Sequence, residues 1–310
     1  MRGPLPQATA SAGRSPTGLR PRVARVSGLC ANRGAPGPAA NSVGQTSGLQ
    51  PAGRLAATLS SLERWLLAIP LAGGFVFGAI PFIAPTAFGK ITGYAGDDPY
   101  IGRLAGAASF GYAAALLVGI RDGAWRPLRA VVVATLTFNL VSIVACLIEI
   151  LLGRAQPVVY LILAASIVIG AITLWLLARR GQAPEGPRDV ATWVVALTGV
   201  ATLAAAFFGI APQFPAQIAP LGGYRGTDEF LYRQAGAATL GYATMGIWEL
   251  RSLRWEEMRL PALMALVFNG LAFVASVLEL GTLTLGVALI GPAALVFALG
   301  FAVALVRRGR

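Results

Sequence analysis

Apolar runs of about 20 residues recur along this 310-residue chain, separated by short polar segments. A helix of about 20 residues crosses the ~30 Å hydrocarbon core of a bilayer. The runs are apolar on every side and lack the period-2 alternation of a membrane barrel. The pattern therefore predicts an all-α polytopic membrane protein. Eight transmembrane helices are expected, over 62–84, 100–120, 130–152, 158–177, 190–210, 231–248, 260–280 and 285–306.

The polar positions between these runs repeat at a constant offset of 130 residues. The stretch 93–113 returns at 223–243 with 12 of 21 residues identical, and Glu149 matches Glu279 in the same register. This indicates two tandem four-helix repeats, over 61–180 and 189–310, joined by a linker at 181–188. Because four is an even number, both repeats enter the membrane from the same side, and the repeats are expected to lie in parallel orientation about a pseudo-two-fold axis.

The basic residues predict the orientation of these helices. Residues 1–60 are rich in Arg, Ser, Gly, Ala and Pro and contain no acidic residue, which is typical of a disordered tail. Twenty basic residues fall on the side of the two termini and five on the opposite side. By the positive-inside rule, both termini are expected in the cytoplasm, so the loops at 93–98 and 223–228 face outward.

Composition narrows the function further. Apolar residues make up 56% of the chain and charged residues 12%, and the net charge of +12 is spread over the tail and loops, so no nucleic-acid partner is expected. The chain has no histidine and two cysteines, which excludes imidazole metal sites and bis-histidine haem ligation. Without a catalytic motif, we interpret it as a non-enzyme with no cofactor and no metal.

Eight polar residues in repeated positions are the candidate ligand-binding residues: Asp98, Arg103, Glu149, Asp228, Arg233, Glu279, Asn139 and Asn269. Asp98 and Asp228 each precede a span, where a carboxylate can cap free backbone N–H groups. The expected depths of the other charges match, which predicts an Arg103–Glu149 pair and an Arg233–Glu279 pair, each within its own repeat. The two asparagines, deep in the third spans, are expected to bind a cation or substrate or, more simply, to hydrogen-bond between helices.

Two interpretations of the charged residues stay open. In the structural one, each pair ties two helices together, a contact worth about 0.6 to 2 kcal/mol in a membrane. In the functional one, the residues line an outward-facing cavity and bind an ion, a proton or a polar headgroup.

A loop of the form GYxGxD followed by an R-x-x-GA-x-x-x-GYA helix begins the second span of each repeat. The motif residues are Arg103, Gly106, Ala107, Gly111, Tyr112 and Ala113, and again Arg233, Gly236, Ala237, Gly241, Tyr242 and Ala243. This unit resembles the small DoxX-like and related four-helix membrane proteins of bacteria. The resemblance implies a bacterial inner (plasma) membrane location, here with two fused copies. Some DoxX-like proteins are associated with quinone-linked redox chemistry, but this chain offers no cysteine pair for it.

Three functional hypotheses follow. The first is a transporter-like or ligand-binding helical bundle, in contact with membrane lipids and binding a small ion or polar ligand. The second is a membrane scaffold or accessory subunit whose charge pairs serve assembly alone. The third is a membrane redox subunit that holds a quinone in an apolar cleft between the repeats.

Overall fold

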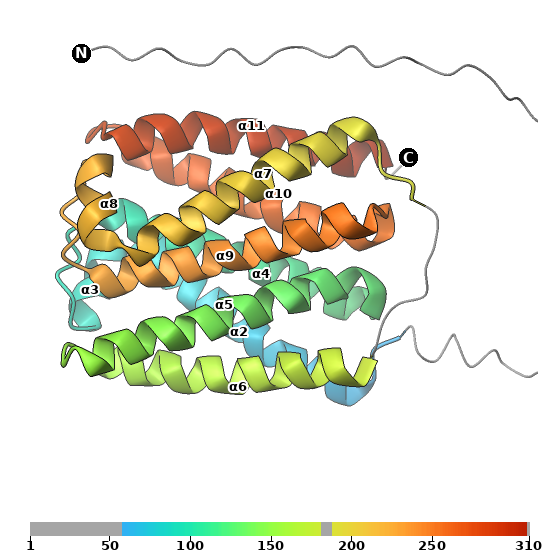
Figure 1. The fold of residues 1–310 in the computed structure, drawn as a ribbon, viewed down its shortest axis with the longest axis horizontal. Coiled ribbons are helices and arrows are strands. Elements are labelled where there is room, and N and C mark those ends of the chain that lie inside the picture. The colour runs from blue at the N-terminus through green and yellow to red at the C-terminus, as the bar shows by residue number, and fades with distance from the viewer. Residues whose placement is uncertain (1–57, 181–187, 309–310) are drawn as a thin grey trace, which may run out of the picture. The chain divides into compact units, whose positions relative to one another are not determined.

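The computed structural model describes residues 58–180 and 188–308, and every named element in these ranges is helical (Figure 1). The first part contains α2 (Ser61–Ile83), α3 (Pro85–Ile91), α4 (Pro99–Asp122), α5 (Trp125–Leu151) and α6 (Pro157–Arg180). The second part contains α7 (Thr192–Ile210), the short 3-10 helix η1 (Ala211–Gln213), α8 (Pro215–Gly222), α9 (Glu229–Ser252), α10 (Trp255–Leu278) and α11 (Leu285–Arg308). We refer to α2–α6 as the first half and to α7–α11 as the second half.

The long helices run back and forth between two ends of a bundle. In Figure 1, α4 and α9 lie in the middle, and α6 and α11 lie at opposite edges. The short helices α3 and α8 lie at one end, together with the two GYxGxD loops. The start of α2 and the end of α11 lie at the other end. We call the end with α3 and α8 the loop end.

Seven of the described helices are long and apolar enough to cross a membrane, as expected of a multi-pass membrane protein: α2, α4, α5, α6, α7 with η1, α10 and α11. The expected sixth span, 231–248, forms the 24-residue helix α9, but its sequence is not apolar enough to belong to this set. The physical reason is its central place. Because α9 packs on α5 and α7 and most of its residues are buried, it can carry polar side chains such as Arg233 away from lipid.

The two halves interlock through their central helices. Helix α4 packs mainly on α2 of its own half and on α10 of the other half, whereas α9 packs mainly on α7 and on α5. Helix α4 has far fewer contacts with α5, its neighbour in sequence, and the same holds for α9 and α10. The second helix of each half therefore contacts the third helix of the other half far more than the third helix of its own half.

A pair of tyrosines joins the halves at the centre of the bundle. The hydroxyl of Tyr112 donates to the carbonyl oxygen of Ala238 at 2.9 Å, and the hydroxyl of Tyr242 donates to that of Ala108 at 3.0 Å. The two rings meet edge to face, 5.2 Å apart. Gly111 allows this approach, since a Cβ there would lie 2.8 Å from a carbonyl oxygen of α10.

Parts of two expected segments lie outside the described residues. Of the predicted disordered tail at 1–60, residues 1–57 lie outside, and so do residues 181–187 of the predicted linker. Where the description begins, the backbone N–H of Leu59 donates to the carbonyl oxygen of Gly123 at 2.7 Å, and the Leu59 side chain is buried. The last residues assigned to the tail are thus attached to the turn between α4 and α5.

Candidate functional site

The buried charges pair between the halves, so the predicted pairing within each repeat is wrong. Arg103 pairs with Glu279, and Arg233 pairs with Glu149, whose oxygen lies 2.6 Å from the Arg233 Nη1. The cause is the interlocking of the bundle, because α4 packs on α10 and α9 packs on α5. All four residues are therefore in direct contact with an opposite charge rather than turned toward a free ligand.

The Arg233–Glu149 pair belongs to a larger charge network at the loop end. Arg154 contacts Glu149 at 3.3 Å and Glu229 at 3.0 Å, and Arg233 also contacts Glu229 at 2.6 Å. The hydrogen bond to Glu229 raises the pKa of Arg154 above its ordinary value, although burial acts the other way. This alternation of two arginines and two glutamates leaves every charge in the network compensated.

Asp98 and Asp228 join the halves instead of capping their own helices, which corrects the expected capping role. Each occupies the N-cap position, but neither side chain makes a capping hydrogen bond. Asp98 accepts from the backbone N–H groups of Arg225 and Gly226 at 3.0 and 2.8 Å. Asp228 accepts from those of Ala95 and Gly96 at 2.8 and 2.6 Å. Each carboxylate thus holds the GYxGxD loop of the other half.

The two asparagines form hydrogen bonds within their own helices, so the expected bonding between helices is also corrected. The Nδ2 of Asn139 donates to the carbonyl oxygen of Thr135 at 2.7 Å, and the Nδ2 of Asn269 donates to that of Ala265 at 2.8 Å. This backbone carbonyl one turn earlier is the nearest acceptor in a helix. The Asn139 amide oxygen stays available to a ligand.

A cavity of about 150 Å³ lies next to Asn139, between helices of the first half and α9 of the second half. Its walls come from α2, α4, α5, α6 and α9, and α3 covers it at the loop end. Its lining is mainly apolar and includes Gly73, Phe77 and Ile162. Of the eight candidate residues, Asn139 and Asp228 line this cavity, while the four paired Arg and Glu residues, Asp98 and Asn269 do not.

A chain of hydrogen bonds between uncharged side chains lies along one wall of the cavity. The Ser166 hydroxyl donates to Ser142 at 3.1 Å, and the Ser142 hydroxyl donates to the amide oxygen of Gln234 at 2.8 Å. The Gln234 Nε2 contacts the sulfur of Cys146 at 3.8 Å. This arrangement turns the amide oxygen of Gln234 toward the serines and leaves its N–H group for another acceptor.

The corresponding positions on α4, α10 and α11 lack this polar chain. At the offset of 130 residues, Gln234 corresponds to Leu104 and Ser142 to Ala272. Ser166 is the tenth residue of α6, and the tenth residue of α11 is Ala294, which is buried to the same extent. Sequence reasoning missed these three residues because it followed what the repeats share. The signal was present as polar residues whose counterparts are apolar.

Tyr94 lies in the first GYxGxD loop and also lines the cavity. Its ring stacks on that of Phe230 at 5.7 Å, as the ring of Tyr224 stacks on Tyr100 at 6.0 Å. Burial, with a smaller effect of the Glu149 charge, raises the pKa of Tyr94 above its ordinary value. Burial likewise raises the pKa of Tyr224 to about 12. Both loop tyrosines therefore stay uncharged near neutral pH and cannot supply an anionic ligand group.

No family model, no curated protein and no solved structure matches this chain. The resemblance to DoxX-like proteins stays a prediction from the sequence motif. The function of the site must be inferred from its geometry. The site is a compact, mainly apolar cavity with one polar wall, and it lies next to the paired arginines and glutamates.

Proposed function

We propose that this chain is an integral membrane protein that binds a small, mainly apolar ligand in the cavity next to Asn139. The observation that carries the proposal is the cavity itself, about 150 Å³ in volume, with Gln234 and Asn139 in a mainly apolar lining. A dry apolar cavity of that size holds about one aromatic ring. Apolar walls with a few placed polar groups are the usual form of a small-molecule site.

The four paired charges serve assembly in this proposal. A charged group buried near a membrane interior is costly when it is alone, and a partner from the other half removes that cost. The Arg103–Glu279 and Arg233–Glu149 pairs join the two halves at the loop end, where the reciprocal contacts of Asp98 and Asp228 join them as well. The outward polar site expected from sequence is thereby replaced by a cavity beside it.

The same proposal includes eight spans arranged as a duplicated unit, with both termini in the cytoplasm of a bacterium. The support is geometric. Helix α9 has 24 residues, as do α4 and α10, and it runs between the same two ends of the bundle (Figure 1). The reciprocal bonds of Tyr112 and Tyr242 lie at positions offset by 130 residues, as expected for two related units.

Binding of toluene to the purified protein tests the proposed site. We expect toluene to raise the melting temperature of the wild type, since a ligand at ten times its Kd stabilises the folded state by about 1.4 kcal/mol. In Gly73→Leu, a side chain fills the cavity, because a Cβ at Gly73 has no neighbour closer than 3.9 Å. This variant is expected to lose the shift. Gly199→Leu is the matched control in α7, where a Cβ has no neighbour within 4 Å.

An equal shift in wild type and Gly73→Leu contradicts the proposed site. The absence of any shift in the wild type favours the second hypothesis, a scaffold without a ligand, which the direct pairing of the charges also supports. A quinone-linked function is the third hypothesis. It is tested with benzoquinone in the same assay, because the cavity supplies polar groups that can hydrogen-bond to a carbonyl oxygen.

A further inference from the structure

We propose that the cavity binds an uncharged, ring-sized molecule that carries a carbonyl-type acceptor, and that this molecule enters from the bilayer between α2 and α6. The inference rests on the proposed function and adds the chemical class of the ligand and its route. Two features around the cavity carry it, namely the fixed amide of Gln234 in α9 and the separation of α2 from α6.

The amide of Gln234 presents a donor to the cavity in a fixed direction. Its oxygen already accepts from Ser142, which in turn accepts from Ser166. A primary amide has two N–H donors, and the contact of Nε2 with the Cys146 sulfur uses at most one of them, at 3.8 Å. Gln234 is half-buried and lines the cavity, so the second N–H is available to an acceptor on a ligand.

Packing of the bundle does not require this polar chain. Helix α10 packs on α4 and α11 as α5 packs on α9 and α6, with Leu104, Ala272 and Ala294 at the corresponding positions. Leu104 packs against an apolar cluster that includes Tyr100 and Val287. Three polar residues that touch one another, in a place where the related half is apolar, indicate a function beyond folding.

The charges around the cavity select against ionic ligands. Asp228 lines the cavity, is 1% exposed and already accepts two backbone N–H groups, so an anion would meet a carboxylate there. The described residues of the lining include no arginine or lysine. A charged ligand would lose its hydration against mainly apolar walls, and a cation would find the lining's carboxylate, Asp228, already accepting two backbone N–H groups. An uncharged acceptor such as a carbonyl oxygen meets neither penalty.

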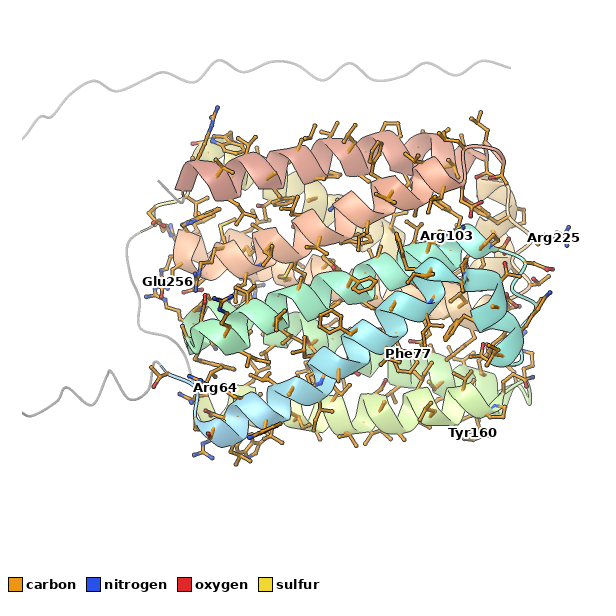
Figure 2. The ribbon with its side chains drawn as sticks, turned by 180° about the vertical axis from the view of Figure 1, so that it is seen from behind. Arg64, Phe77, Arg103, Tyr160, Arg225 and Glu256 are labelled. Carbon is orange, nitrogen blue, oxygen red and sulfur yellow. The ribbon has the colours of Figure 1, made fainter. Side chains whose placement is uncertain are left out.

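The route follows from how α2 and α6 diverge. At the end opposite the loops, Arg180 of α6 holds Glu63 of α2 through its Nε, at 2.7 Å. Beyond that pair the two helices have few contacts, and Figure 2 shows them separating from Arg64 toward Tyr160, with Phe77 in the part of α2 where they are apart. Phe77 lines the cavity and is half-buried. At the loop end, α3 covers the cavity with Phe88.

The ligand class is tested with three probes of one ring each, toluene, benzaldehyde and benzoate, and the full chain in nanodiscs. We expect Gln234→Leu to weaken benzaldehyde binding about fivefold or more, the effect of one neutral hydrogen bond. Toluene is expected to bind both proteins equally and benzoate to bind neither. Leucine is the residue at the corresponding position of α4, Leu104, so the variant is expected to fold. Ser142→Ala removes the hydroxyl that fixes the Gln234 amide and leaves the size of the amide unchanged, so it is expected to weaken benzaldehyde binding independently. The exposed Gln217→Leu is the control.

The route is tested by rates of benzaldehyde binding. Phe77→Ala opens the gap between α2 and α6, so association and dissociation are expected to speed up together, whereas Phe88→Ala leaves both rates unchanged. The opposite result, with Phe88→Ala alone accelerating binding, overturns entry from the bilayer. Equal benzaldehyde affinity in wild type, Gln234→Leu and Ser142→Ala overturns the ligand class, even when toluene still binds. If toluene fails to bind as well, the proposed function itself is wrong.

Discussion

Arg103 and Arg233 each pair with a glutamate from the other half, but the two pairs differ in their surroundings. Among the described residues, Glu279 is the one carboxylate paired with Arg103. Arg233 contacts both Glu149 and Glu229, and Arg154 contacts the same two carboxylates. Loss of one glutamate therefore leaves Arg103 without a counter-charge but leaves Arg233 with one.

We expect Glu279→Gln to destabilise the protein more than Glu149→Gln. Leaving a largely buried charged donor without its partner costs about 1 to 3 kcal/mol, and the Glu149 site keeps part of its network. Equilibrium unfolding in detergent measures both losses. The double variant Arg103→Gln/Glu279→Gln should regain stability, because two amides can hydrogen-bond without a charge. Equal losses in the two single variants, or loss of toluene binding in either, would contradict the assembly role.

At the scale of elements, the close contacts of α4 with α10 and of α9 with α5 depend on glycine. A Cβ at Gly111 would lie 2.8 Å from the carbonyl oxygen of Met264, and a Cβ at Gly241 would lie 2.6 Å from that of Ala134. Each glycine directly precedes the tyrosine that joins the central helices, Tyr112 or Tyr242. The glycine and tyrosine of each GYA segment thus hold the two halves together.

Gly111→Ala is therefore expected to destabilise the bundle by about 1 to 3 kcal/mol, the usual cost of overpacking, because the obstacle is backbone and cannot rotate away. Gly270→Ala in α10 is the matched control. No atom lies within 4 Å of a Cβ at Gly270, so alanine should be neutral or stabilising there. Melting temperatures of the two variants in the same detergent decide the matter, and equal values would argue against the close approach.

The helices could be predicted from sequence because each apolar run is long enough to cross a bilayer, and all eight expected runs are helical. The partners of Arg103 and Arg233 could not, since depth along a helix does not say which helix lies beside it. The cavity could not be predicted from the sequence either. It depends on the angle between α2 and α6, and the counterpart of its key residue Gln234 in the first half, Leu104, is apolar.

At the scale of the whole molecule, the number of spans decides the topology. Seven crossings would leave the two ends of the chain on opposite sides of the membrane, whereas eight leave them on the same side. The start of α2 and the end of α11 lie at the same end of the bundle (Figure 1). This is why we propose that α9 crosses as well, packed on α5 and α7.

A reporter fused to the C-terminus checks this count. Alkaline phosphatase, which is active outside the cytoplasm, is expected to be inactive when it follows the last residue. The same reporter inserted in the loop at 223–228 is expected to be active, because the basic residues predict that this loop faces outward. An active C-terminal fusion would mean that α9 does not cross the membrane.

The central claim is that the cavity next to Asn139, rather than the charge pairs, is where a ligand binds. A crystal structure of the protein soaked with bromobenzene tests it most directly, because bromine locates the ring by anomalous scattering. The expected peak lies between α2 and α6, within contact distance of Phe77 and Gln234. A peak beside Arg103 and Glu279, or none within the bundle while the crystals stay intact, would contradict the claim.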